Sequence, residues 1–142
     1  MTRRLLTIGP KDSIGNLQGL MREFRFRHLP VVEGNVLVGL ISRSDLVALS
    51  SSVLSKSAAE ENAILHRLAA SRIMQREVVT VRPDEPLINV AALMWETRVR
   101  SIPVTDPGGA LVGIITEGDF LRLAHHHLLK PESASQRSET RH

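Results

Sequence analysis

Short apolar runs and apolar residues at helical spacing follow one another along this chain, and their order occurs twice. In the first half, residues 5–8 form a short apolar run that Gly9-Pro10 closes. Two more runs, residues 29–32 and 36–42, lie on either side of the turn Glu33-Gly34-Asn35. The three runs predict three strands, of which the last two form an antiparallel hairpin.

Apolar residues at helical spacing predict one helix between the first two strands and another after the hairpin. Asp12 or Ser13 is placed to cap the first of these helices. The second helix is predicted over residues 44–49, so the first half is a β-α-β-β-α unit. The apolar face of the first helix consists of Ile14, Leu17, Leu20, Met21 and Phe24.

The second half repeats this order of elements. Residues 78–81 predict a strand, and Pro86 suits the first turn of the helix that follows. Residues 102–105 and 111–116 predict a second hairpin, and residues 117–128 a final helix. The buried face of the helix after Pro86 is predicted to consist of Leu87, Val90, Leu93 and Met94.

A serine-rich stretch and a further amphipathic pattern connect the two units. Residues 50–57 are predicted to be a linker. Residues 58–74 predict a connecting helix, and its apolar positions are Ile64, Leu65, Leu68 and Ile73.

The two halves are copies of each other in sequence as well as in pattern. Gly39-Leu-Ile-Ser-Arg-Ser-Asp45 occurs again as Gly113-Ile-Ile-Thr-Glu-Gly-Asp119. An offset of 73 aligns the residues before Glu33, and an offset of 74 aligns those after the turn. The slip lies in a glycine-rich turn, where an insertion is tolerated best. The aligned identities include Thr7 with Thr80, Arg27 with Arg100, Pro30 with Pro103, Leu37 with Leu111, and Asp45 with Asp119. An internal repeat of this kind determines the fold interpretation.

Two β-α-β-β-α units, each ending in Gly-apolar-apolar-Ser/Thr-x-x-Asp after an apolar-Pro-Val strand, resemble a tandem pair of CBS (cystathionine-β-synthase) domains. Such a pair is called a Bateman module, and here it resembles a stand-alone CBS domain protein. The resemblance implies an α+β fold in which the two repeats are related by pseudo-twofold symmetry.

The resemblance divides the chain into four parts. Repeat 1 is expected over residues 1–50, the linker and connecting helix over 51–72, repeat 2 over 73–128 and a disordered tail over 129–142. Repeat 1 is expected to be short at its N-terminus, because Met1 aligns with Met74, unless the true start lies upstream.

The function that the resemblance implies is a regulatory sensor for adenosine-type ligands. These are AMP, ADP or ATP, and less often S-adenosylmethionine or NAD, and binding changes conformation or assembly. The expected partners are a second copy of the chain, in a disk-like homodimer, and a protein target that the sequence does not identify. The alternative is a dimerisation or interaction scaffold that binds no nucleotide.

The resemblance also implies a set of nucleotide-binding residues. Asp45 and Asp119 correspond to aspartates that accept hydrogen bonds from ribose hydroxyls, with Ser42 and Thr116 near the ribose or phosphate. Arg27, His28 and Arg100 correspond to phosphate contacts, and Ser101 replaces the His28 equivalent. The residues implied to line the nucleoside pocket are Thr7, Thr80, Pro30, Ile102 and Pro103.

Elementary chemistry allows this assignment and also a simpler one. A carboxylate can accept from vicinal ribose hydroxyls, and a helix N-terminus favours phosphate. However, Ser42 with Asp45 and Thr116 with Asp119 also fit a capping box. Arginines such as Arg98 near a helix C-terminus are favourable without a ligand.

Composition and charge narrow the possible functions. Aromatic residues make up 3% of the chain, which leaves few stacking surfaces for single-stranded nucleic acid. The net charge is +3 with only three lysines and dispersed arginines, which argues against a nucleic-acid partner. No cysteine is present, so disulfides and thiolate metal sites are excluded. No apolar segment approaches the roughly 20 residues of a membrane span, and no signal peptide is recognised, so a cytoplasmic location is expected.

No arrangement of residues in the sequence predicts catalysis, so the chain is interpreted as non-enzymatic. His125-His126-His127 cannot all bind one metal from a helix, because consecutive residues point in different directions. No metal site is predicted. Trp95 is interpreted as an interface or packing residue rather than a stacking platform.

Overall fold

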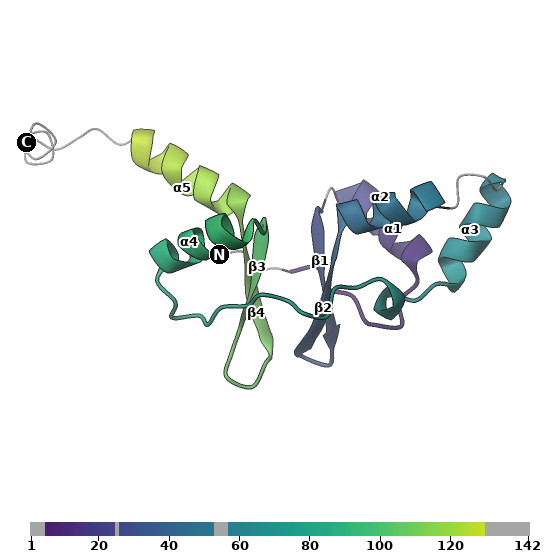
Figure 1. The fold of residues 1–142 in the computed structure, drawn as a ribbon, viewed down its shortest axis with the longest axis horizontal. Helices are drawn as coiled ribbons and strands as arrows, with labels where there is room; N and C mark the ends of the chain where they lie inside the picture. The colour runs from purple at the N-terminus through teal and green to yellow at the C-terminus, as the bar shows by residue number, and fades with distance from the viewer. Residues whose placement is uncertain (1–4, 25, 53–56, 130–142) are drawn as a thin grey trace, which may run out of the picture.

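A computed structural model describes residues 5–24, 26–52 and 57–129 of the chain. Two antiparallel hairpins lie side by side in the middle of the molecule (Figure 1). The helices of the first half gather at one end and those of the second half at the other end. The architecture is therefore α+β, with the two halves of the chain on opposite sides of the paired hairpins.

The first half contains α1 (Ile14–Phe24), β1 (His28–Glu33), β2 (Val36–Ser42) and α2 (Arg43–Ser52). Gly34 has a φ of +63°, the left-handed conformation that glycine adopts without cost, and it turns the chain between β1 and β2. Of the predicted apolar face of α1, Ile14, Leu17 and Met21 are buried, whereas Phe24 is 54% exposed.

The second half contains α4 (Leu87–Thr97), β3 (Ser101–Thr105), β4 (Leu111–Thr116) and α5 (Glu117–Leu129). Its register matches that of the first half, because Ser101 pairs with Thr116 as His28 pairs with Ser42. The β-bulge after Val104 corresponds to the bulge after Val31. Both hairpins therefore have the positions that the sequence predicts.

The first strand of each unit is much shorter than predicted. Residues 5–8 make one parallel bridge, in which Ile8 donates to Pro30 O at 3.1 Å and accepts from Val32 N–H at 2.8 Å. Residues 78–81 make the equivalent single bridge between Val81 and Val104. The order β-α-β-β-α is kept, but the leading strand is reduced to one paired residue in each unit.

The connecting helix also differs from the prediction. It begins as α3 (Ala58–Arg67), capped by Ser57, whose Oγ accepts from Glu60 N–H. It ends at Arg67 rather than Met74, because the next carbonyl, Leu68 O, accepts from Ile14 N–H at 2.8 Å. A 3-10 turn, η1 (Ala70–Arg72), follows. Backbone pairing with the start of α1 thus replaces the last helical turns.

Beyond η1 the connector packs against the free edge of β2. Gln75 and Leu40 exchange two backbone hydrogen bonds, of 2.9 and 3.0 Å. A Cβ on Gly39 would lie 2.5 Å from Met74 Sδ, so the close approach requires glycine at that position.

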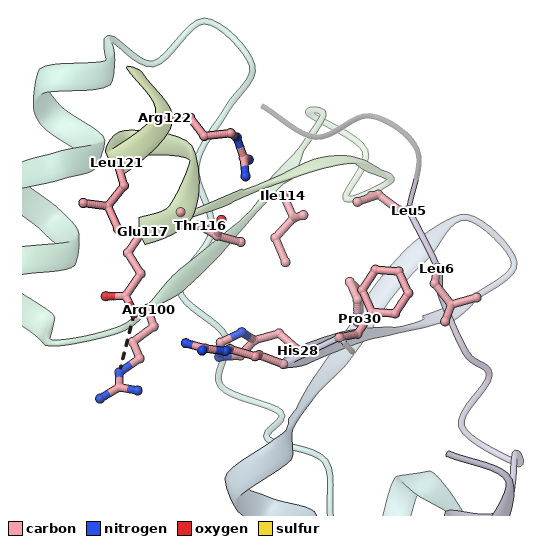
Figure 2. A pocket seen from close by; sticks show the side chains of 13 residues that line it. Leu5, Leu6, His28, Pro30, Arg100, Ile114, Thr116, Glu117, Leu121 and Arg122 are labelled. Carbon is pink, nitrogen blue, oxygen red and sulfur yellow. Dashed lines mark ion pairs between the residues drawn. The ribbon is translucent and has the colours of Figure 1, made fainter. Parts of the chain in front are cut away.

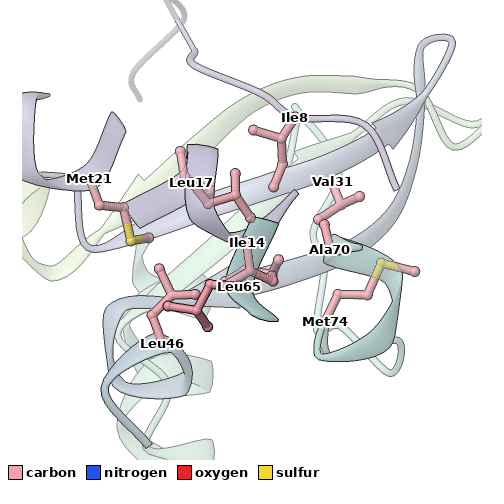
Figure 3. Packing of buried hydrophobic residues seen from close by; sticks show 11 residues of the cluster. Ile8, Ile14, Leu17, Met21, Val31, Leu46, Leu65, Ala70 and Met74 are labelled. Carbon is pink, nitrogen blue, oxygen red and sulfur yellow. The ribbon is translucent and has the colours of Figure 1, made fainter. Parts of the chain in front are cut away.

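Each half has its own hydrophobic core. Among the described residues, the first core contains eleven buried side chains, from the segment before α1, α1, the hairpin, α2, α3 and the connector (Figure 3). The second core contains six in the same part of the chain: Val81, Val90, Met94, Ile102, Val104 and Ile115.

The two halves are joined at the tips of their hairpins. Leu37 N–H donates to Gly109 O at 3.1 Å, and Leu111 N–H donates to Asn35 O at 2.9 Å.

None of the helices in the described part of the chain has the length and apolar character of a membrane span.

Candidate functional site

One cleft between the two halves opens at the N-terminus of α5, and we call it the α5 cleft (Figure 2). Its volume is about 540 Å³. The first half contributes the segment before α1 and the start of β1, and the second half contributes β4 and the first turns of α5. The lining residues are Leu5, Leu6, Phe26, Arg27, His28, Pro30, Arg100, Ile114, Thr116, Glu117, Gly118, Leu121 and Arg122.

A second cleft opens at the N-terminus of α2, and we call it the α2 cleft. It consists of two pockets of about 560 and 340 Å³ that share His28, Ser42, Ser44 and Arg100. The remaining lining residues are Arg27, Arg43, Val47 and Ala48 in the larger pocket, and Leu40, Gln75, Glu77, Val78, Val79, Arg98, Val99 and Ser101 in the smaller one.

The repeat offset relates the two clefts to each other. Each combines the leading segment and hairpin start of one half with the strand end and helix start of the other half. The equivalent positions are Leu5 and Val78, Leu6 and Val79, Arg27 and Arg100, His28 and Ser101, Ile114 and Leu40, Thr116 and Ser42, and Gly118 and Ser44. Arg27, His28 and Arg100 line both clefts, so they lie between them.

The aspartates of the two repeated motifs act as helix caps in this structure. Asp45 Oδ2 accepts from Ser42 N–H at 2.9 Å, while Ser42 Oγ accepts from Asp45 N–H at 3.1 Å. Asp119 and Thr116 make the same reciprocal pair, at 2.8 and 3.4 Å. This geometry is a capping box with aspartate in place of glutamate. It fixes the motif hydroxyl at the edge of each cleft.

Charged side chains surround the shared centre of the clefts. Arg100 Nε lies 3.9 Å from Glu117 Oε1, with both side chains more than half exposed, and Figure 2 shows this pair at one side of the α5 cleft. Arg122 forms an ion pair with Asp119. Burial, and after it the nearby Arg100 guanidinium, lowers the pKa of the His28 imidazole from its usual 6.5. His28 therefore remains mostly neutral at neutral pH.

The structure brings six of the twelve predicted site residues together at the clefts: Arg27, His28, Pro30, Ser42, Arg100 and Thr116. Asp45 and Asp119 lie at their edges as caps, and Asp119 also lines a separate pocket with Leu123 and His126. Thr7 is half-buried, Thr80 is exposed, and neither lines the two clefts. Ile102 and Pro103 are fully buried in the second half.

Several cleft residues were not predicted from the sequence. Glu117 and Arg43 occupy variable positions of the repeated motif, and only their alignment with each other could have singled them out. Arg122, Leu5 and Leu121 carry no local signal, because their place depends on how the two halves pack.

The histidines of α5 do not form a metal site in the part of the chain that is described. His125, His126 and His127 are all exposed. Within residues 5–24, 26–52 and 57–129, no group of three or more histidine, aspartate or glutamate side chains is arranged to hold an ion.

Comparison with known proteins identifies the repeats. A family model described as CBS domain matches residues 1–52 and 70–126. A solved structure of an acetoin utilization protein (AcuB) from Vibrio cholerae is 29% identical, with a TM-score of 0.76 over 90% of this chain and 88% of that chain. These matches confirm the resemblance to a tandem CBS pair and the α+β fold with two repeats.

Two further solved structures contain bound ligands. CBSX2, a chloroplastic protein of Arabidopsis thaliana, was solved in complex with AMP; it is 31% identical, with a TM-score of 0.75 over 89% of this chain and 92% of that chain. The CBS domain pair of protein MJ0100 was solved with 5′-methylthioadenosine and S-adenosyl-L-methionine; it is 28% identical, with a TM-score of 0.70 over 86% of this chain and 92% of that chain.

Many relatives are longer than this chain. Among the first five curated proteins that it matches, the chain spans between 22% and 44% of their length. These relatives include enzymes such as homoserine O-acetyltransferase from Methanococcoides burtonii, which is 36% identical over 87% of this chain but only 23% of that protein. The enzyme names therefore describe proteins of which this chain matches a part.

Proposed function

Because the chain belongs to the CBS domain family, we propose that it is a non-enzymatic regulatory module that binds an adenosine-type ligand between its repeats. The ligand is AMP, ADP or ATP in preference to S-adenosylmethionine or NAD. The observation that carries the proposal is that each cleft takes residues from both repeats. A ligand held by both repeats favours one relative arrangement of them and so shifts conformation or assembly.

The chemistry of the α5 cleft suits a nucleotide. Leu5, Leu6 and Ile114 supply apolar contact area for a base. Figure 2 shows the side chains of Leu5 and Ile114 directed toward the same space. Arg27 and Arg100 supply donors for phosphate. A ligand pocket of this type combines apolar walls with a few polar groups. The bound AMP of CBSX2 and the bound methylthioadenosine of MJ0100 support the same ligand class here.

The cap aspartates are proposed to contact the ribose as well. In each cap, Oδ2 accepts from the backbone of the motif, as described above. A carboxylate has acceptor capacity for several hydrogen bonds, so capping and ribose binding are compatible. The proposed binding unit comprises residues 1–50 and 73–128, connected by residues 51–72.

The experiment is a thermal-denaturation screen of the full chain against AMP, ADP, ATP, S-adenosylmethionine and NAD. A ligand at about 100 times its Kd adds roughly 2.7 kcal/mol to the free energy of unfolding. Asp45→Asn and Asp119→Asn are the informative variants, because asparagine keeps a cap acceptor but loses the charge that favours ribose hydroxyls. We expect a ligand-induced shift in the wild type that one or both variants reduce.

Two results would contradict the proposal. One is the absence of a shift with all five ligands. The other is an equal shift in the wild type and in both asparagine variants, which would leave the aspartates as caps alone.

A second candidate function is an interaction scaffold, and the exposed apolar surface of the second repeat favours it. On α4, Ile88 is 76% and Trp95 is 87% exposed, and on α5, Leu121 is 70% exposed. Large apolar side chains that remain exposed on two helices of the same repeat are the kind of surface that a partner covers. We propose a second copy of the chain as its occupant, in a disk-like homodimer whose arrangement a protein target would sense.

Light scattering of the wild type and Trp95→Asp tests this candidate. The expected result is a dimer in the wild type and a monomer in the variant. A monomeric wild type would contradict the dimer. A dimer that no nucleotide stabilises would favour the scaffold over the sensor.

A further inference from the structure

The two clefts carry opposite charges at one equivalent position. The repeat offset aligns Arg43, the first residue of α2, with Glu117, the first residue of α5. Each follows the hydroxyl residue of its capping box. Arg43 lines the α2 cleft and Glu117 lines the α5 cleft. The substitution changes the charge at the mouth of a cleft by two units.

The two clefts share Arg27 and Arg100 and differ in the other charged side chains that line them. In the α5 cleft, Glu117 pairs with Arg100, and Asp119 pairs with Arg122. In the α2 cleft, Arg43 Nη2 donates to the backbone carbonyl of Met21 at 3.5 Å. Arg27 lines both clefts, so Arg43 is the arginine that the α2 cleft has in addition, and among the described residues Arg43 makes no ion pair. The α2 cleft therefore has one more guanidinium group available for an anion.

The hydroxyl groups of the two caps also differ, in whether their proton is already donated within the cap. Thr116 Oγ1 donates its proton to Asp119 Oδ2 at 3.3 Å, within the α5 cap. In the α2 cap, the Ser42 hydroxyl accepts from Asp45 N–H and donates to no other group among the described residues. Ser44 adds a second hydroxyl to the α2 cleft. The α2 cleft therefore has hydroxyl donors as well as arginines.

A buried hydroxyl without a partner points independently to a ligand in the α2 cleft. Ser101 lines its smaller pocket and is 5% exposed, and its Oγ has no hydrogen-bond partner among the described residues. Buried polar atoms are nearly always paired, and a molecule bound in the smaller pocket would supply the partner that Ser101 Oγ lacks. The equivalent position, His28, is shared by both clefts.

We propose that the α2 cleft is the site for a phosphate chain of at least two phosphates, and that Arg43 determines this preference. Arg27, which lines both clefts, supplies further charge, and Ser42, Ser44 and Ser101 supply hydroxyl groups. Glu117 makes the α5 cleft the weaker site for such a chain. The inference deepens the proposed function and rests on it for the nucleoside part of the ligand. The phosphate part can be tested without a nucleoside.

The experiment is calorimetric titration of the full chain with inorganic tripolyphosphate. We expect one site per chain in the wild type. Arg43→Gln should weaken binding about tenfold, the effect of losing a charge-assisted hydrogen bond, and Arg43→Glu should abolish it. Arg67→Gln, which removes an exposed arginine at the end of α3 outside both clefts, is the matched control and should bind as the wild type does. Glu117→Arg should add a second site.

Thermal denaturation without ligand checks that each variant is folded. Unchanged binding in folded Arg43→Gln, two equal sites in the wild type, or no binding of tripolyphosphate would overturn the inference. If tripolyphosphate binds through Arg43 but no nucleotide in the screen binds, the inference stands and the proposed function fails. If AMP binds and tripolyphosphate does not, the proposed function stands and the inference fails.

Discussion

The two repeats share their hairpins and caps but differ in what covers their helices. Both have the same register, the same bulge position and the same capping box. In the first repeat, α3 packs on α1, and its Leu65 is buried in the core. In the second repeat, α5 has no buried residue. The hairpin and cap geometry at the clefts is therefore shared, whereas the cover of the helices differs between the repeats.

A single aligned pair of residues shows how this difference arises. A Cβ on Gly15 would lie 2.4 Å from the His66 ring, so glycine allows α3 to pack directly on α1. The equivalent residue in the second repeat is Ile88, which is 76% exposed on α4. One repeat therefore carries its own cover, and the other presents apolar side chains that a second molecule could cover.

The largest expected change in the free energy of unfolding comes from α3, the helix that packs on α1. Leu65→Ala removes a side chain that is 3% exposed, and it should lower the free energy of unfolding by about 2–5 kcal/mol. Leu128→Ala on α5, where the leucine is 82% exposed, should change it by less than about 0.5 kcal/mol. Urea denaturation measures both. A similar loss in the two variants would contradict the difference in cover between the repeats.

Removing the carboxylate of a cap should lower the free energy of unfolding by less, and by a similar amount in both repeats. Asp45→Ala and Asp119→Ala each remove one carboxylate acceptor of a capping box and should cost about 0.5–2 kcal/mol. The ion pair between Asp119 and the exposed Arg122 should add little to the cost of Asp119→Ala. Denaturation without ligand measures the two costs. A loss in only one variant would show that the caps are not equivalent.

The smallest expected effect concerns His28, whose equivalent in the second repeat is Ser101. Burial lowers the pKa of His28 in the folded chain, so below about pH 6.5 the unfolded chain binds a proton that the folded chain does not. Stability should therefore fall as the pH drops through this window, by at most about 1.4 kcal/mol per pH unit. His28→Ser, which copies the second repeat, should lose this part of the pH dependence.

Denaturation midpoints of the wild type and His28→Ser at about pH 7.5 and about pH 5.5 provide the measurement. Equal pH dependence in the two proteins would show that His28 is not held neutral by its surroundings.

The hairpins and caps could be predicted because their signals are local. The apolar runs on either side of Gly34 lie within one hairpin, and the motif from Gly39 to Asp45 contains both partners of its cap. Because the second half contains the same signals, each of these predictions was made twice. The α+β fold class followed from the resemblance that these repeated local signals carry.

The connector and the clefts could not be predicted in the same way, because they depend on contacts between distant residues. Leu68 is partly buried against the first core, as a helical pattern predicts. However, its carbonyl binds Ile14 N–H, and this pairing ends the helix early. Similarly, Leu5 and Ile114 meet in one cleft only because the two hairpins pack side by side. No spacing in the sequence encodes that contact.

Amide hydrogen exchange with and without AMP tests most directly whether a ligand binds between the repeats. If it does, exchange should slow together in two segments that are far apart in sequence. These are residues 26–30 and 114–118 for the α5 cleft, or residues 40–44 and 98–101 for the α2 cleft. Slower exchange confined to one repeat, or no change at saturating AMP, would contradict the account.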